Sequence, residues 1–256
     1  MTQRILHALP RSNRFGGPGW LSKSGGVLTY SQCAHGLLIA TNQQLRNIWE
    51  RFTPFIHRVQ SLDGLPALPS SRLTKMAQEA ALDQSPELLA HGYRSALFAC
   101  ALAHIDKIKV DFELLYVCGL LHDVGLMTAV TGEDFTLRSA AVARRCACES
   151  GESPEVADHL ADALITHTTV GISPDRDGCL GSYTQYGAMV DLTGLRLTHL
   201  PRAFVADVLN KHPRGMFKRE ILAHLDREAA AVKGGRFDFA KRVGLDIAVR
   251  YSPFPS

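Results

Sequence analysis

Ionisable side chains inside apolar helical runs constrain this chain of 256 residues more than any other feature. His91 lies in the apolar segment 85–105, and His122 and Asp123 directly follow the run LLYVCGLL. Asp191 lies in a later run of the same kind, AMVDL. An ionised carboxylate in such surroundings is costly unless a cation compensates its charge. Two imidazoles and two carboxylates gathered around one divalent cation would remove that cost.

The periodicity of the chain predicts an all-α fold. Apolar residues recur at helical spacing, and no pair of segments alternates as strands do. The segments with this spacing are 31–52, 85–105, 111–125, 135–149, 153–168 and 184–197, with two shorter runs in 201–232. Ser85-Pro86 and Ser153-Pro154 are typical helix starts, Asp111 is a third cap, and Gly125 is the expected end of its helix.

The domain organisation is predicted from a Pro- and Ser-rich connection, LDGLPALPSSR, near residue 70. Residues 1–75 are expected to form an N-terminal extension that packs on the main domain. Residues 76–256 are expected to form that domain together with a C-terminal helical extension.

Charge and composition exclude several classes of protein. The 28 basic and 25 acidic residues leave a net charge of +3 without a clustered basic face, so nucleic-acid binding is not expected. No run of about 18 apolar residues predicts a membrane span, and the first residues lack the core of a signal peptide. The six cysteines include no second pair for a zinc knuckle, which favours reduced thiols and a cytoplasmic protein.

The types of ligand atom limit which metal ions could bind, but they do not by themselves establish a metal site. Nitrogen and oxygen donors suit zinc, iron, manganese and other first-row ions. A single histidine on a helix is more often a core or surface residue than a ligand, and a His-Asp pair alone is weak evidence. The ordered set within consecutive apolar helices is what favours a metal.

The order of His91, His122-Asp123 and Asp191 resembles the H…HD…D pattern of the HD superfamily of metal-dependent phosphohydrolases and their relatives. The resemblance covers roughly residues 80–230. It implies an HD-domain helical bundle around a buried metal site, with His91 as the first ligand, His122 and Asp123 as the signature pair and Asp191 as the last ligand.

Departures from the general HD pattern favour one branch. Phe135 stands where a second-metal ligand is common, and only His159 and His167 follow as candidates, so one divalent ion is expected. Leu126 stands where many HD nucleotidases have a glutamate. The chain is most similar to the cyanamide hydratase branch, whose members hydrate the nitrile of cyanamide with a bound zinc. This similarity rests on the motifs HDVGL, DFTLRSAAVARR, ITHTTVG, GSYTQYGAMVDLTGLRL and HPRGMFK.

The resemblance implies a hydratase or hydrolase that acts on a small nitrogen-containing molecule. Asp123 would orient water, and His167 would act as acid or base, unless it only caps a helix or donates to a carbonyl. Thr168 and Gln185 are expected to line the substrate site, although Gln185 on the solvent side is equally compatible with the sequence. The resemblance also suggests a homo-oligomer.

Two other functions remain open from the sequence. An HD phosphohydrolase for a nucleotide or other phosphate ester would need a basic pocket around the metal, whereas a hydratase would have a less charged one. A catalytically silent regulatory protein could also keep a metal for stability.

Overall fold

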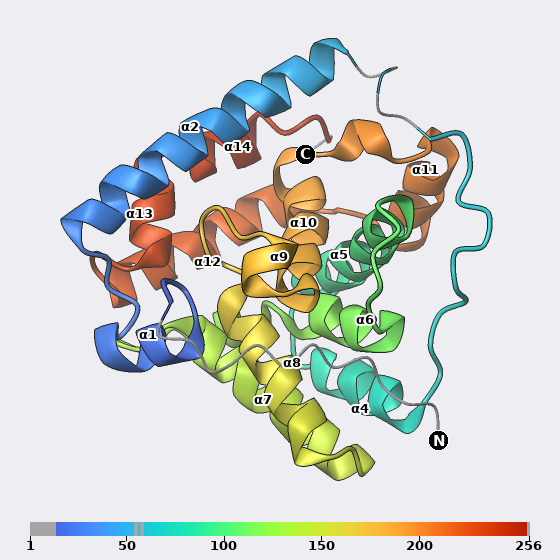
Figure 1. Ribbon diagram of the computed structural model, residues 1–256, viewed down its shortest axis with the longest axis horizontal. Coiled ribbons are helices and arrows are strands. Elements are labelled where there is room, and N and C mark those ends of the chain that lie inside the picture. The colour runs from blue at the N-terminus through green and yellow to red at the C-terminus, as the bar shows by residue number, and fades with distance from the viewer. Residues whose placement is uncertain (1–13, 54–55, 57–58, 255–256) are drawn as a thin grey trace.

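The computed structural model describes residues 14–53, 56 and 59–254 (Figure 1). Its regular elements are helices, and two isolated β-bridges are the only extended pairings within these residues. The all-α fold expected from the sequence is therefore confirmed. Residues 1–13 of the predicted extension lie outside the described residues.

The helices follow one another closely along the chain. The α-helices are α1 (Pro18–Ser24), α2 (Tyr30–Phe52), α4 (Arg72–Ala81), α5 (Pro86–Ile105), α6 (Phe112–Leu121), α7 (Phe135–Ser150), α8 (Pro154–Thr166), α9 (Pro174–Asp177), α10 (Cys179–Thr193), α11 (Arg202–Lys211), α12 (Phe217–Ala231), α13 (Arg236–Arg242) and α14 (Leu245–Arg250). Two 3-10 turns, η1 (Val124–Met127) and η2 (Leu197–His199), follow α6 and α10.

Three central helices begin where the sequence predicts. Ser85 and Ser153 precede the first-turn prolines of α5 and α8, and each side chain accepts a hydrogen bond from the backbone N–H three residues on. The Asp111 carboxylate accepts from two backbone N–H groups in the first turn of α6. These caps satisfy donors that a helix start would otherwise leave unpaired.

Helix α6 ends earlier than expected. The sequence predicts an end at Gly125, but Leu121 is the last helical residue and His122 occupies the C-cap position. A Cβ atom at Gly125 would lie 2.2 Å from the carbonyl oxygen of Phe135, so the chain passes the start of α7 too closely for any side chain. The early end places His122 and Asp123 in a turn, where their side chains are not fixed to a helical face.

The centre of the molecule is built from α5, α6 and α10, which pack closely against one another. A Cβ at Gly119 of α6 would lie 2.4 Å from the Cα of Ala96, and one at Gly187 of α10 would lie 2.2 Å from the carbonyl oxygen of Ser95. Only glycine permits these approaches to α5. The contacts bring His91 on α5 close to the end of α6.

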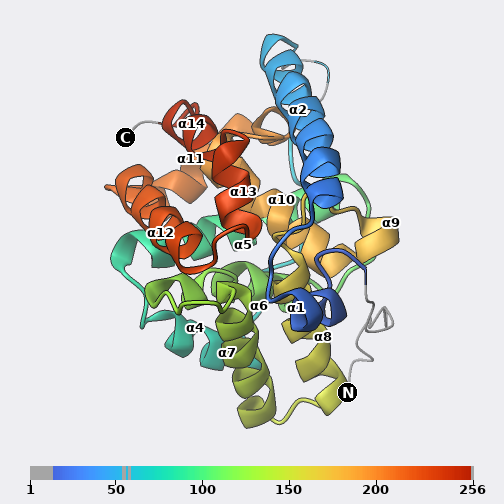
Figure 2. The same cartoon turned by 90° about the vertical axis from the view of Figure 1, so that its left-hand side faces the viewer.

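The remaining helices cover this centre on two sides. Helices α7 and α8 pack together, and α4 packs on α6 and α7. Helix α12 contacts α5, α13 and α14 on the other side, where these C-terminal helices lie together in Figures 1 and 2. The predicted boundary at residues 75 and 76 falls inside α4, and the division into extension and domain stays a prediction.

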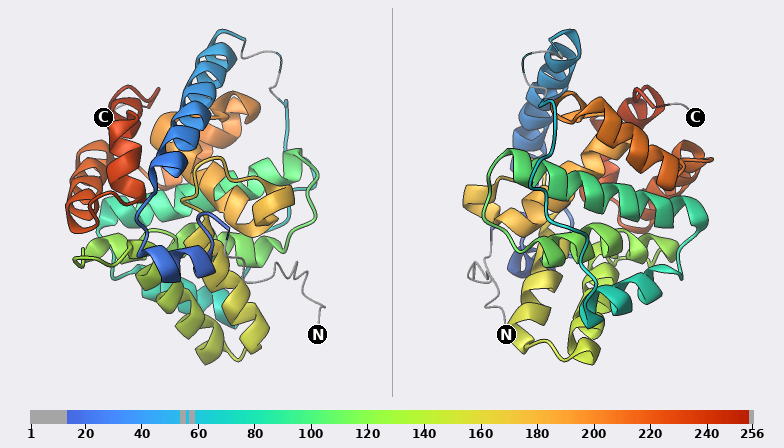
Figure 3. Two further views of the ribbon diagram at one scale, coloured as in Figure 1. Left: turned by 60° about the vertical axis from the view of Figure 1, so that its left-hand side comes forward. Right: turned by 90° about the vertical axis from the view of Figure 1, so that its right-hand side faces the viewer.

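Helix α2 is the least covered of the long helices and confirms the prediction for 31–52. Its far end extends beyond the other helices in Figures 2 and 3. Large apolar side chains are exposed along it, namely Tyr30, Leu37, Leu38, Leu45, Ile48, Trp49 and Phe52. Within the described residues, no helix combines the length and the apolar character that a bilayer crossing requires.

Candidate metal centre

His91 is held inside the protein by a hydrogen bond at one ring nitrogen and by an aromatic ring stacked on one face. It lies in the interior of α5 with no exposed surface. Its Nδ1 atom lies 2.7 Å from Asp191 Oδ2, and the ring of Phe217 stacks on it at 4.5 Å between centroids. Because a carboxylate only accepts, Nδ1 carries the ring proton and Nε2 carries the lone pair. The lone pair faces away from Asp191.

His122 is fixed in the same tautomer by the helix that precedes it. Its Nδ1 atom donates to the carbonyl oxygen of Gly119 at 2.7 Å, in the last turn of α6. The ring is 1% exposed, so water does not solvate the other nitrogen. Nε2 is buried and has no hydrogen-bond partner. A buried imidazole nitrogen without a hydrogen-bond partner can bind a cation when it is deprotonated.

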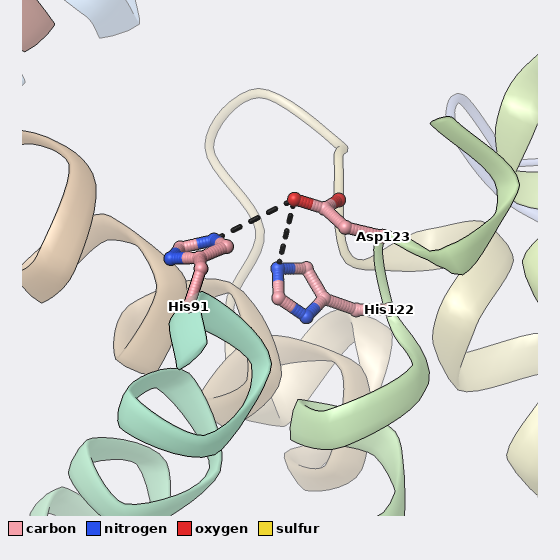
Figure 4. A group of neighbouring side chains, drawn as sticks. All are labelled: His91, His122 and Asp123. Carbon is pink, nitrogen blue, oxygen red and sulfur yellow. Dashed lines mark ion pairs between the residues drawn. The ribbon is translucent and has the colours of Figure 1, made fainter. Parts of the chain in front are cut away.

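Asp123 completes the cluster (Figure 4). Its Oδ2 atom lies 3.5 Å from His91 Nε2 and 3.3 Å from His122 Nε2. Among the described residues, these three form the group of histidine, cysteine and acidic side chains whose ligand atoms all lie within 4.8 Å of one another. Two imidazole nitrogens and a carboxylate oxygen converge here, and a divalent cation would compensate that arrangement.

Asp191 occupies a different place from the one expected for a direct ligand. Its carboxylate lies behind His91, on the Nδ1 side of the ring. Arg94 donates to both of its oxygens at 2.9 and 2.8 Å, and Arg214 donates to Oδ1 and to the Asp191 backbone carbonyl. Both oxygens are therefore engaged by protein donors. Of the four predicted ligands, the structure brings three together and places the fourth where it orients His91.

The charges around Asp191 keep it ionised. Burial raises the pKa of this carboxyl, but the hydrogen bond from His91 and the positive charges of Arg94 and Arg214 outweigh burial. The net result is a pKa far below the ordinary value. The lowered pKa favours the ionised carboxylate, which accepts the His91 Nδ1 proton.

The members of the cluster shift one another's pKa values. Burial raises the pKa of Asp123, but the imidazoles of His122 and His91 hold it well below its ordinary value. Burial lowers the pKa of His122, whereas the Asp123 carboxylate raises it, and the net pKa lies above the ordinary value. A proton and a cation therefore compete for His122 Nε2, because a ligand nitrogen must be deprotonated.

A cavity opens beside the cluster, and His122 and Asp123 form part of its wall. Its volume is about 160 Å³. The wall comes from α10, α12, α13, the start of α14 and the middle of α2, which contributes Ala40. Residues from both ends of the chain thus enclose one space next to the candidate ligands.

His167 lies at this cavity as the C-cap of α8. Its Nδ1 atom donates to the carbonyl oxygen of Leu164 at 2.5 Å, as the alternative interpretation of the sequence allowed. Burial lowers the pKa of His167 to about 3, helped by the neighbouring His122 ring at 5.3 Å between centroids. His167 is therefore neutral near pH 7, with Nε2 as an acceptor. The sequence allows His167 to act as an acid or as a base. A neutral imidazole whose Nε2 carries a lone pair is compatible with the base role.

Thr168 and Gln185 both line the cavity, as the sequence predicts. The Thr168 hydroxyl is buried without a hydrogen-bond partner. Gln185 Nε2 donates to the backbone carbonyls of His167 and Thr169 at 2.6 and 3.0 Å, so it holds the turn after α8 in place. Gln185 is thus not a free solvent-facing side chain.

Two positions that the sequence singled out as departures are buried beside the site. Leu126 is 3% exposed and lines the cavity. Phe135 has no exposed surface, and its ring lies edge-on to His167 at 6.1 Å. Both side chains place apolar surface where the general HD pattern has ionisable groups.

The sequence reasoning missed the groups that engage Asp191. Arg94 lies one turn beyond His91, and the sequence allows it to pair with a substrate charge or with a structural carboxylate; the structure shows the carboxylate. Arg214 and Phe217 belong to the motif HPRGMFK, for which the sequence allows the site rim or an oligomer contact and favours packing. The signal that could have found them is a basic residue one turn from a buried ligand, since a buried carboxylate needs such a partner.

No protein-family model matches the chain, and no curated protein matches it in sequence. Function is therefore inferred from the chemistry of the site.

Proposed function

We propose that this protein is a metal-dependent enzyme of the HD superfamily that adds water to the nitrile of a small nitrogen-containing molecule, as the cyanamide hydratase branch does. The observation that supports it is the convergence of His91 Nε2, His122 Nε2 and Asp123 Oδ2 beside a cavity with little charge. Ligand atoms at a cavity wall can act on a bound molecule, whereas a closed structural site cannot.

The residues fit one divalent ion, and zinc is our first choice. Two imidazole nitrogens and one carboxylate oxygen are a donor set of catalytic zinc sites, and iron or manganese accept the same donors. His91, His122 and Asp123 would hold the ion, and Asp191 would fix the His91 ring through Nδ1. When bound, the ion supplies Lewis acidity that makes water a better nucleophile or a nitrile a better electrophile.

The side chains at the cavity would handle the protons. Hydration joins the water oxygen to the nitrile carbon and moves one C–N bonding pair to nitrogen, which takes one water proton to give an imidic acid. The second proton then moves from oxygen to nitrogen while the second C–N bonding pair shifts to nitrogen and the C=O bond forms, which gives the amide. Asp123 would orient the water, and His167 Nε2 would accept its first proton and return it to the substrate nitrogen. The unpaired Thr168 hydroxyl would donate a hydrogen bond to that nitrogen.

Replacing His167 by alanine tests this role directly. A base with a pKa of about 3 is weak, so we expect turnover to fall by about 10²-fold, at the low end for general base catalysis. Metal content should stay unchanged, because His167 is outside the group of converging ligands. A His167→Ala protein with full metal and full turnover would remove His167 from the mechanism.

The charge of the cavity argues against a phosphate ester as substrate. Arg236 is the one Lys or Arg among the described residues that line it. Its guanidinium already donates to Asp134, Thr136 and the Ile165 carbonyl, so it is not available to a phosphate. A phosphohydrolase would need such a cation.

Metal analysis followed by a substrate screen tests the proposal as a whole. We expect close to one metal ion per chain, and amide or urea formation from nitriles or cyanamide. His122→Ala, which removes a candidate ligand, is the matched inactive control. Phosphate release from monoesters or cyclic nucleotides without action on nitriles would contradict the proposal. A ratio near two metals per chain would contradict the single ion.

A further inference from the structure

Most of the cavity lies away from the candidate ligands and is apolar. His122, Asp123, His167, Thr168 and Gln185 are neighbours in the chain or joined by a hydrogen bond or a ring contact, so they form one polar end. Gln43 and Gln44 of α2 and Arg236 of α13 also line the cavity. The remaining wall is mainly aliphatic and aromatic. It includes Leu126, Met189, Leu192, Ile221, Leu225 and Phe237.

The cavity is larger than a molecule such as cyanamide requires. A single water needs roughly 10–15 Å³ of cavity volume measured in this way. The volume here is about 160 Å³, so a nitrile group with one small substituent would leave most of the apolar wall without contact. Apolar surface of this extent favours a ligand that removes it from water.

The cavity also offers nothing to a charged ligand beyond the ligand cluster. Arg236 is fully engaged by hydrogen bonds to Asp134, Thr136 and Ile165, and its charge is balanced by the Asp134 carboxylate. Among the described lining residues, Asp123 is the one acidic side chain, and it belongs to the cluster. A charged group that lies against the apolar wall, away from the candidate metal ligands, would lose its hydration without gaining an oppositely charged partner.

We infer that the cavity takes an uncharged molecule with an apolar body of at least the size of a phenyl ring. The identity of the reacting group rests on the proposed function, and with it the substrate is an uncharged aryl or alkyl nitrile. Its nitrile group lies at the end formed by His122, His167 and Thr168, and its body lies against Met189, Leu192 and the other apolar residues. Hydration of the nitrile releases the corresponding amide.

Binding of an unreactive probe tests the cavity independently of turnover. Calorimetry on the metal-loaded, full-length protein would compare acetophenone, which is uncharged, with phenyltrimethylammonium, which has a similar size, a permanent positive charge and no lone pair to bind a metal. We expect acetophenone to bind at least about tenfold more tightly, in line with the selectivity of apolar pockets. Equal or tighter binding of phenyltrimethylammonium, or no binding of acetophenone, would overturn the assignment.

A pair of variants on α2 locates the binding. Ala40 lines the cavity, whereas Ala34 lies on the same helix, is exposed and is absent from the wall. Ala40→Phe should weaken acetophenone binding at least about tenfold because its ring occupies the space, and Ala34→Phe should leave binding unchanged. Ala240→Phe narrows the same cavity from α13 and should act like Ala40→Phe. Equal effects of Ala40→Phe and Ala34→Phe would place the probe elsewhere and overturn the assignment.

Turnover then separates this assignment from the proposed function. We expect benzonitrile to be hydrated with a higher kcat/KM than cyanamide or 4-cyanobenzoate, and Ala40→Phe to lower the ratio of benzonitrile to cyanamide. Hydration of cyanamide with no preference for benzonitrile would keep the proposed function and overturn the assignment. Binding of acetophenone at this cavity with no hydration of any nitrile would support the apolar ligand and contradict the proposed function.

Discussion

Two buried arginine–aspartate pairs flank the candidate metal centre, and they differ in what they hold. Asp191 pairs with Arg94 and Arg214 on the side of His91, and Asp134 pairs with Arg236 on the side of His167. Both carboxylates are almost inaccessible, at 0% and 3% exposure. For both carboxyls burial alone would raise the pKa, but the arginine partners bring it below the ordinary value.

The first pair acts on the candidate ligands. Asp191 accepts the Nδ1 proton of His91, so its position sets the direction in which His91 Nε2 points. Phe217 stacks on this ring and also contacts the two guanidiniums, with Arg94 and Arg214 at 5.0 and 4.9 Å from its centroid. Loss of the pair would therefore change the metal centre.

The second pair connects α13, which lines the cavity, to the start of α7 and the end of α8. Asp134 caps the start of α7, where it accepts from the Thr136 backbone N–H. Arg236, on α13, donates to Asp134 and to the carbonyl of Ile165 near the end of α8. No member of the candidate ligand group contacts this pair through a hydrogen bond among the described residues. The same chemistry thus orients a ligand in one place and connects helices in the other.

The largest expected effect comes from Asp191→Asn. Two buried guanidiniums lose their counter-charge, and removing one partner of a buried ion pair typically costs about 3–5 kcal/mol of unfolding free energy. His91 also loses its orienting acceptor, so metal content should fall sharply. Urea unfolding and metal analysis of the purified protein would measure both. A stable Asp191→Asn protein with full metal would show that Asp191 neither balances the arginines nor orients His91.

Asp134→Asn is the matched variant at the second pair. We expect its unfolding free energy to fall by about 3 kcal/mol, because Arg236 becomes a buried charge without a counter-charge. The loss is at the lower end of the range because an asparagine still caps α7. Metal content per folded chain should stay at the wild-type value. If Asp134→Asn loses metal as completely as Asp191→Asn, the two pairs do not differ in the way proposed.

Phe217→Leu removes the ring that contacts both His91 and the arginines of the first pair. The smaller, non-aromatic side chain should lower the unfolding free energy by about 1–2 kcal/mol, because it leaves a cavity and loses the cation–π contacts. Metal affinity should weaken by about tenfold, as for other groups that support a ligand. Phe98→Leu is the control, because Phe98 is equally buried and pairs with Phe204 instead. Equal loss of metal affinity in both variants would contradict a specific role for Phe217.

The smallest expected effect is a change in acid sensitivity. The pKa of Asp134 is lowered from 3.8 in the folded protein, so its ionised form stabilises the fold above pH about 4. That contribution is lost as the pH falls through the folded-state pKa, with a slope of at most about 1.4 kcal/mol per pH unit. Asp134→Asn should therefore show a shallower decline of unfolding free energy as the pH falls below about 4.

Urea unfolding across this pH range would measure the decline, with a chelator present so that metal binding does not contribute. A variant whose stability declines as steeply as that of the wild type would show that Asp134 is not among the carboxyl groups responsible.

The sequence predicts the features that local signals determine. Ser85, Ser153 and Asp111 mark helix starts because a cap depends on the residue itself and on its next neighbours. The position of His122 and Asp123 after a long apolar run places them in the core, and the structure brings both to the cluster with His91. The all-α architecture follows from the same periodicity.

What the sequence does not predict depends on contacts between distant segments. Arg214 reaches Asp191 across 23 residues and Arg94 across 97, so no local pattern connects them. The early end of α6 depends on the approach of Gly125 to Phe135. The cavity joins Ala40 of α2 to residues of α13 and α14, and its size could not be foreseen from any one segment.

His122 and His167 share one further property, since each is the C-cap of its helix and donates Nδ1–H to the carbonyl three residues earlier. Those carbonyls, of Gly119 and Leu164, belong to the last turns of α6 and α8. If the last turn of either helix opened, its carbonyl would no longer hold the Nδ1–H group, and the imidazole would be free to move. A ligand that holds the Nε2 side therefore shifts the local opening equilibrium of the last turn. Metal binding should slow amide hydrogen exchange at the end of α6, and occupation of the cavity should slow it at the end of α8.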